Sequence, residues 1–131
     1  MIVADASTII EVLLRTRLAE KCRDRLLNSG EALCAPYLLD IEVVQVLRRY
    51  TIHSDISQDR GRLALDDFRD MPVIRYPHEP FLPRVWELRK SVSAYDAVYI
   101  ALAEVLDAPL VTCDGRLARA HGHRAVVEVI A

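Results

Sequence analysis

The chain begins with Met1-Ile-Val-Ala-Asp5, a short apolar run that ends in an acid and leads into Ala-Ser7-Thr8. A run this short and this apolar is typical of a strand that is buried on both faces. Ser7 and Thr8 are favourable helix-starting residues, and Thr8-x-x-Glu11 fits a capping box, so we expect a helix from about Ser7 to Leu14. The start of the chain therefore predicts a strand that passes directly into a helix.

The same alternation continues to the end of the chain. Further strands are expected at residues 32–35, 73–74, 109–113 and 125–129, and further helices at residues 18–28, 36–50, 57–69, 84–90, 94–106 and 115–120. The helix at 36–50 opens with Pro36 and is apolar nearly all round, which predicts deep burial. Strands that alternate with helices form a parallel sheet covered on both faces. We therefore expect a single domain over residues 1–131, a three-layer α/β/α fold with a mostly parallel sheet of four or five strands.

Composition limits the cellular setting and the class of protein. The chain has 131 residues, of which 52% are hydrophobic and 27% charged, as in an ordinary globular domain. Its cysteines, Cys22, Cys34 and Cys113, form no close-spaced pair, which favours reduced thiols over a disulfide framework. No signal peptide is visible, and no apolar run approaches the roughly 20 residues that a membrane span needs. We expect a cytoplasmic protein that is not inserted in a membrane.

Four acids occupy positions that parallel topology brings to one edge of the sheet. Asp5 ends the first strand and Asp114 follows the strand at 109–113. Glu42 and Asp96 lie in the first turns of the two most apolar helices. The carboxyl ends of parallel strands, and the helices that start there, form the ligand-binding edge of such sheets. We therefore expect the four carboxylates to converge on one pocket.

Carboxylates packed this closely would repel one another and raise one another's pKa values unless a cation lay between them. Oxygen ligands without nearby cysteine or histidine favour a hard ion such as Mg²⁺ or Mn²⁺. Such an ion can activate water and stabilise charge on a phosphoryl group. The acids therefore predict hydrolysis of a phosphodiester.

Each acid also has a purely structural interpretation. Asp114 could cap the helix at 115–120, Asp96 completes the capping-box pattern Ser93-x-x-Asp96, and Asp5 could cap the first helix. Glu42 has the weakest structural alternative, because its neighbours are apolar. The functional prediction rests on the location that the four acids share.

Four segments, in this order, resemble those of PIN-domain nucleases. They are Ile-Val-Ala-Asp5-Ala-Ser7, Pro36-x-x-x-x-x-Glu42-Val, Ser93-x-Tyr-Asp96-Ala-x-Tyr-x-Ala-x-Ala103 and Leu-Val-Thr112-x-Asp114-x-x-Leu117-Ala118. Together they span most of the chain. For a chain this short, the resemblance is closest to the VapC toxins.

The resemblance implies a Mg²⁺-dependent endoribonuclease that cuts single-stranded regions of RNA, with Mn²⁺ as a substitute ion, acting as the toxin of a toxin–antitoxin pair. Where the motifs match, the resemblance implies that Asp5 and Asp96 are the principal metal ligands. Glu42 completes the acidic quartet by binding metal or orienting the attacking water. Asp114 holds a second metal or a ligating water.

The resemblance also implies a homodimer and a small VapB-type antitoxin that lies across the acidic groove. Ser7 and Thr112 become polar supports of the site, although a helix cap and a strand-end residue explain them equally well. The segment from 53 to 90 matches the family least, and it would shape the choice of RNA.

The net charge of −2 argues weakly against a general nucleic-acid binder, but nearly all positive charge is arginine, which suits phosphate recognition. Arg116 and Arg119, beside the proposed site, could contact RNA phosphates or could simply be solvated. The four histidines are expected in solvated loops: His53, His78, His121 and His123. The aromatic side chains Trp86, Tyr95 and Tyr99 are expected to pack rather than to stack on bases.

Three alternatives remain beside a PIN-domain toxin. A phosphoacceptor regulatory domain would need adjacent acids after the first strand and a lysine after a late one, whereas Asp5 is followed by Ala6. A non-catalytic PIN-like interaction module would be expected to lack some of the acids. A PIN nuclease that acts in RNA maturation has the same chemistry as a toxin, and sequence does not separate the two.

Overall fold

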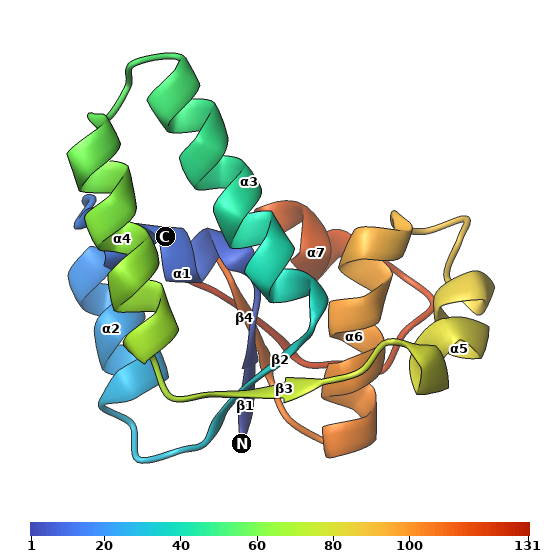
Figure 1. The fold of residues 1–131 in the computed structure, drawn as a ribbon. Helices are drawn as coiled ribbons and strands as arrows, with labels where there is room; N and C mark the ends of the chain where they lie inside the picture. Colours follow the sequence, from blue (N-terminus) through green and yellow to red (C-terminus); the bar gives the residue numbers. More distant parts are fainter.

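The computed structural model describes residues 1–131 and has a central sheet of five parallel strands in the order β3-β2-β1-β4-β5 (Figure 1). The strands are β1 (Ile2–Ala4), β2 (Leu33–Pro36), β3 (Val73–Tyr76), β4 (Leu110–Thr112) and β5 (Val127–Val129). The helices are α1 (Ala6–Leu14), α2 (Ala19–Leu27), α3 (Leu38–Ile52), α4 (Gln58–Asp70), α5 (Leu82–Glu87), α6 (Ala94–Leu106) and α7 (Gly115–Arg119), with a 3₁₀ turn at Glu79–Phe81. The predicted α/β class and the parallel sheet are confirmed.

The strand order reverses its direction at β1. The chain moves outward from β1 to β2 and β3, and then returns to the other side of β1 to form β4 and β5. Val3 of β1 is in register with Leu110 of β4, and Ile2 with Leu33 of β2. In open parallel sheets the crevice at such a reversal, beyond the carboxyl ends of the strands, is where ligands bind. Asp5 and Asp114 follow the two strands that flank this point.

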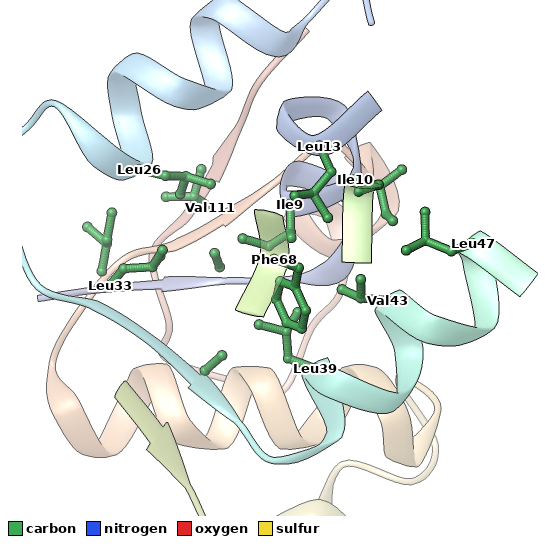
Figure 2. Close-up of a cluster of buried hydrophobic side chains, with 14 residues drawn as sticks. Ile9, Ile10, Leu13, Leu26, Leu33, Leu39, Val43, Leu47, Phe68 and Val111 are labelled. Carbon is green, nitrogen blue, oxygen red and sulfur yellow. The ribbon is translucent and has the colours of Figure 1, made fainter. Parts of the chain in front are cut away.

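Alternate side chains of the sheet enter two separate hydrophobic layers. Ile2 and Ala4 of β1 pack on one face with residues of α1 to α4, while Val3 faces the other layer. Figure 2 shows the first layer, where Phe68 of α4 lies among apolar side chains of α1 and α3. The second layer is built mainly from α6, in which every residue from Ala97 to Ala103 is buried. Burial on both faces explains why β1 and β4 are continuous apolar runs.

The deep burial expected for residues 36–50 is wrong. Leu39, Val43 and Leu47 are buried, but Ile41 is 68% exposed and Val44 is 43% exposed. The helix lies in an outer layer, so only the stripe of residues spaced four apart reaches the core. The apolar residues on its other face remain on the surface.

The predicted helix start at Pro36 is also wrong, because Pro36 is the last residue of β2. The backbone N–H of Tyr37 donates to the carbonyl of Tyr76, which extends the pairing of β2 with β3. The helix begins at Leu38, whose N–H donates to Nε2 of His78 at 2.7 Å. His78 therefore caps α3 across 40 residues of sequence instead of being simply solvated in a loop.

The helix expected at residues 84–90 lies earlier in the structure, at Leu82–Glu87, and it follows the 3₁₀ turn. The last strand is shorter than expected at Val127–Val129. No helix of this structure has the length and apolar character needed to cross a membrane.

Candidate active site

Asp5 lies immediately after β1 and is buried, with 8% of its surface exposed. Its Oδ1 accepts hydrogen bonds from the hydroxyl of Ser7 at 2.6 Å and from the backbone N–H of Thr8 at 3.4 Å. Its Oδ2 accepts from the hydroxyl of Thr112 at 2.5 Å. Asp5 is thus the N-cap of α1, and the capping box expected at Thr8 and Glu11 is wrong. The side chain is fixed from both β1 and β4, which flank the reversal of the sheet.

The environment of Asp5 disfavours an isolated negative charge. Burial raises the pKa of Asp5, and the hydrogen bonds from Ser7, Thr112 and Thr8 oppose this only in part. The three hydrogen-bond donors fix the orientation of this carboxylate, but they do not fully offset the cost of burying its negative charge. A cation at its open side would supply the missing compensation.

Ser7 and Thr112 connect Asp5 to the loop that carries Asp114. The Ser7 oxygen that donates to Asp5 also accepts the backbone N–H of Cys113 at 2.9 Å. In the same way, the Thr112 hydroxyl accepts the backbone N–H of Asp114 at 2.9 Å. Both hydroxyls therefore use a donor and an acceptor function at once, and they set the spacing between the ends of β1 and β4.

Glu42 reaches the site from α3 and is held by α6. The phenol of Tyr99 donates to Oε1 of Glu42 at 2.6 Å. Burial raises the pKa of Glu42, as do the charges of Asp5 and Asp96, whereas the bond from Tyr99 lowers it. Burial and the bond to Glu42 in turn raise the pKa of Tyr99, so the phenol keeps its proton. Tyr99 packs in the core as expected, and it also positions a site carboxylate, which sequence reasoning missed.

Asp96 lies in the first turn of α6, where Ser93 is the N-cap and accepts the backbone N–H of Asp96 at 3.2 Å. This bond is the first half of the predicted capping box, and the Asp96 carboxylate does not return a bond to the backbone N–H of Ser93. Burial raises the pKa of Asp96, and the charge of Asp114 adds to this effect. The Asp96 and Asp114 side chains are thus close enough to repel each other.

Asp114 is engaged by an arginine of its own loop. Its Oδ1 accepts the backbone N–H of Arg116 at 2.9 Å, which makes Asp114 the N-cap of α7. The guanidinium of Arg116 donates to both carboxylate oxygens, at 3.0 Å from Nε to Oδ1 and 2.6 Å from Nη2 to Oδ2. This pairing lowers the pKa of Asp114. Asp114 does cap α7, as the structural interpretation expected. Its carboxylate is also paired with the guanidinium of Arg116.

The charges of the four acids affect one another, but their side chains do not form a complete metal-binding site. Glu42 is affected by the charges of Asp5 and Asp96, and Asp96 by that of Asp114. No three His, Cys, Asp or Glu side chains are arranged to hold an ion, and the Asp114 carboxylate is paired with Arg116. The donor set nevertheless fits a hard divalent cation, because it consists of carboxylates, three of them with raised pKa values. Ion binding would require small side-chain movements, above all at Asp114.

A polar cavity of about 540 Å³ adjoins one of these acids. Asp96 lines it, together with Arg116 and Arg119 of α7 and with His121. The two arginines named from the sequence therefore lie beside the acids. His121 lies in an exposed loop, as expected, and its Nδ1 is 3.2 Å from the hydroxyl of Ser91.

Two thiols beside the site were not expected to meet. The sulfur atoms of Cys22 in α2 and Cys113 after β4 lie 3.8 Å apart. Burial raises the pKa of Cys22 to about 12 and also raises that of Cys113. A raised pKa favours the protonated thiol, and only the folded chain brings together these positions, which are 91 residues apart.

Comparison with known proteins gives a consistent result. The PIN domain family matches residues 2–122. The chain is 41% identical over 131 residues to Ribonuclease VapC12 of Mycobacterium tuberculosis, covering 100% of both proteins. It is 43% identical over 117 residues to VapC ribonuclease Mb0985 of Mycobacterium bovis, covering 89% of this chain and 88% of that protein.

Solved structures share the fold at lower identity. The crystal structure of VapBC2 from Rickettsia felis, bound to a promoter DNA fragment, matches with a TM-score of 0.72 at 14% identity, over 100% of both chains. That of Mycobacterium tuberculosis VapC20, described as a sarcin-ricin loop cleaving toxin, matches with a TM-score of 0.68 at 16% identity, over 96% and 98%. From its motifs, its fold and its curated relatives, this chain belongs to the PIN-domain family, among the VapC ribonucleases.

Proposed function

We propose that this PIN-domain ribonuclease is the toxin of a toxin–antitoxin pair and that it hydrolyses single-stranded RNA with the help of Mg²⁺ or Mn²⁺. The observation that carries the proposal is the state of Asp5. It is buried at the reversal point of the sheet, its orientation is fixed by two hydroxyls, and burial raises its pKa. Asp96 and Glu42 are close by and have raised pKa values as well.

The residues that would hold the ion are Asp5 and Asp96, with Glu42 and Asp114 completing the set. When bound, the ion activates a water molecule and stabilises negative charge on the phosphoryl group. Ser7 and Thr112 keep the Asp5 carboxylate in one orientation.

Glu42 is suited to accept the proton of the attacking water. Tyr99 occupies only Oε1, so Oε2 remains available as the acceptor. The raised pKa of Glu42 brings it closer to neutral pH, which makes it a stronger base than an ordinary carboxylate. The Tyr99 bond also keeps this carboxylate aimed at the site.

Arg116 and Arg119 supply the positive charge that RNA phosphates need. Arg116 is exposed, so its guanidinium can exchange the Asp114 carboxylate for a phosphate. Such an exchange would free Asp114 to turn toward the ion. RNA binding and completion of the acidic site would then be coupled.

A VapB-type antitoxin is the partner we propose. Solved complexes with this fold include VapBC2 from Rickettsia felis and VapBC from Salmonella typhimurium bound to DNA. On this chain the outer face of α3 leaves Ile41, Val44 and Ile52 exposed, as expected of a surface that a protein partner covers. A homodimer is proposed from the family resemblance.

The test uses total RNA incubated with the purified protein, with Mg²⁺ or with a chelator, followed by mapping of the cleavage ends. We expect defined cuts in single-stranded regions only with the ion, and none from Asp5→Asn or Asp96→Asn. Expression without an antitoxin should stop growth, and the same substitutions should restore it. Equal cleavage with the chelator would refute the metal dependence, whereas cleavage without growth arrest would favour a role in RNA maturation.

A further inference from the structure

Trp86 is a large aromatic side chain that the fold leaves uncovered. It was expected to pack, yet it is 67% exposed on α5, and it is the only tryptophan of the chain. The guanidinium of Arg89 stacks over its ring, 4.5 Å from the centroid. Tyr95, at the start of α6, is 64% exposed. Exposed aromatic faces beside a polar groove are surfaces on which nucleic acid bases stack.

The surface around Trp86 adjoins the polar cavity that contains Asp96. Trp86 and Arg89 line a cavity of about 500 Å³ whose walls also include Val92 and Ser93. The same Val92 and Ser93 line the polar cavity that contains Asp96. The loop between α5 and α6 therefore borders both cavities, which adjoin each other at Val92 and Ser93.

The polar cavity holds an arginine that pairs with no acid. Arg119 takes part in none of the ion pairs of the protein, whereas Arg116 is bound to Asp114. His121 and Ser91 add hydrogen-bonding groups to the same wall. An unpaired guanidinium with hydroxyl and imidazole neighbours suits a phosphate dianion or diester.

We propose that the two cavities form one nucleotide-binding subsite next to the acids, in which an RNA base stacks on Trp86 and its phosphate binds Arg119. The proposal rests on the ribonuclease function proposed above and deepens it. Stacking on an aromatic face does not read the edges of a base, so this subsite accepts any base. It selects instead for an unpaired one, because a base within a duplex is already stacked on both sides. The preference for single-stranded RNA would thus be set by Trp86.

The test follows the fluorescence of Trp86, which is free of other tryptophan signals. Asp5→Asn protein, which we expect not to cleave RNA, is titrated with oligoadenylate or oligouridylate of about ten nucleotides in Mg²⁺ buffer. We expect quenching by both strands and little by the same sequence within a duplex. Trp86→Ala in the same background should weaken binding, measured by anisotropy of labelled RNA, by about 5- to 150-fold, as stacking energies of this kind imply. Trp86→Phe should retain most of the affinity.

The phosphate contact is tested by the salt dependence of binding. Arg119→Gln should reduce the slope of log affinity against log salt by about 0.7, the value for one phosphate contact on a single strand. The matched control is Arg69→Gln, an exposed arginine in the last turn of α4, at the opposite edge of the sheet and without an ion pair. It should leave the slope unchanged.

Four outcomes would overturn the subsite. RNA that binds without quenching Trp86, or that binds Trp86→Ala as tightly as the parent, refutes stacking even if cleavage by the wild type persists. Trp86 emission that changes with protein concentration in the absence of RNA assigns this face to contact between two copies of the chain. A loss of slope in both arginine variants refutes a specific phosphate contact. Failure of the wild type to cleave RNA is a separate result, which refutes the proposed function itself.

Discussion

Replacing Tyr99 by phenylalanine would remove the single hydroxyl that holds Glu42. The phenol donates to Oε1 of Glu42 at 2.6 Å, and the Tyr99 ring is buried in α6. Phenylalanine keeps the ring and its packing, so the variant isolates the hydrogen bond. Glu42 would keep its place on α3 but lose its donor.

The cost follows from the charge and burial of Glu42. A hydrogen bond to a charged group contributes about 1.5–3 kcal/mol, and the lower end applies because Glu42 is only half-buried and water can replace part of the bond. For a chain of this length, ~4 °C of melting temperature corresponds to 1 kcal/mol, so we expect a decrease of about 6 °C. The decrease should depend on pH, because the bond is strongest to ionised Glu42.

The loss of stability in the variant should be largest where Glu42 is ionised. The pKa of Glu42 in the folded protein lies above its ordinary value of 4.5, and the Tyr99 bond is one of the effects that lower it. Without the bond, the folded pKa rises further, so the variant loses most stability above that pKa, where Glu42 is ionised. Below pH 4.5 the carboxyl is protonated in both the folded and the unfolded chain, and the difference between variant and wild type shrinks.

Thermal denaturation between pH 4 and pH 8, in a chelator, measures this effect. The control is Tyr95→Phe, which lies on the same helix with its side chain exposed, and which should leave the melting temperature unchanged. An equal loss in both variants, or a loss that does not diminish in acid, would refute the role given to Tyr99.

Three further outcomes are expected. Glu104→Gln should lower the free energy of unfolding by about 3 kcal/mol at pH 7, because it breaks the two-pronged bond from Arg84 to a carboxylate that is nearly fully buried. Arg84 lowers the pKa of Glu104, so this stability is present above pH 4.5 and the deficit should vanish as the pH falls below it in urea denaturation. Arg116→Gln should release Asp114 and tighten Mn²⁺ binding in calorimetry, while weakening RNA binding in anisotropy. Cys22 should resist iodoacetamide at pH 8 in the folded protein and react after unfolding, as mass spectrometry can show, because burial raises its pKa to about 12.

Each of these outcomes has a control or a contradicting result. Glu87→Gln removes the other, exposed partner of Arg84 and should cost less than ~1 kcal/mol. An ion affinity that stays constant or falls in Arg116→Gln contradicts competition between the guanidinium and the ion. Rapid modification of Cys22 in the folded protein contradicts its burial.

The placement of Asp5 and Asp114 at one edge of the sheet could be predicted, because topology determines it. Asp5 and Asp114 each follow a short apolar run, and parallel pairing of β1 with β4 places the ends of both runs together. Asp96 lies in the first turn of α6, a helix that the apolar pattern of residues 94–106 predicted. These inferences depend on the direction of the backbone, which hydrophobic patterning reports well.

The contacts between side chains could not be predicted, because they depend on packing between distant segments. Tyr99 donates to a residue 57 positions away, although its place three residues after Asp96 puts it on the same face of α6 and hints at the site. His78 caps α3 from 40 positions away. Apolar content also overstated the burial of α3, because it does not tell how many layers cover a helix.

Manganese-induced broadening of the amide signals in a ¹H–¹⁵N NMR spectrum measures directly whether the acids hold an ion together. With Mn²⁺ well below one equivalent, the signals of Asp5, Glu42, Asp96 and Asp114 should broaden first and together, and Asp5→Asn should abolish the effect. Broadening centred elsewhere, or at one of these residues alone, would contradict a shared metal site.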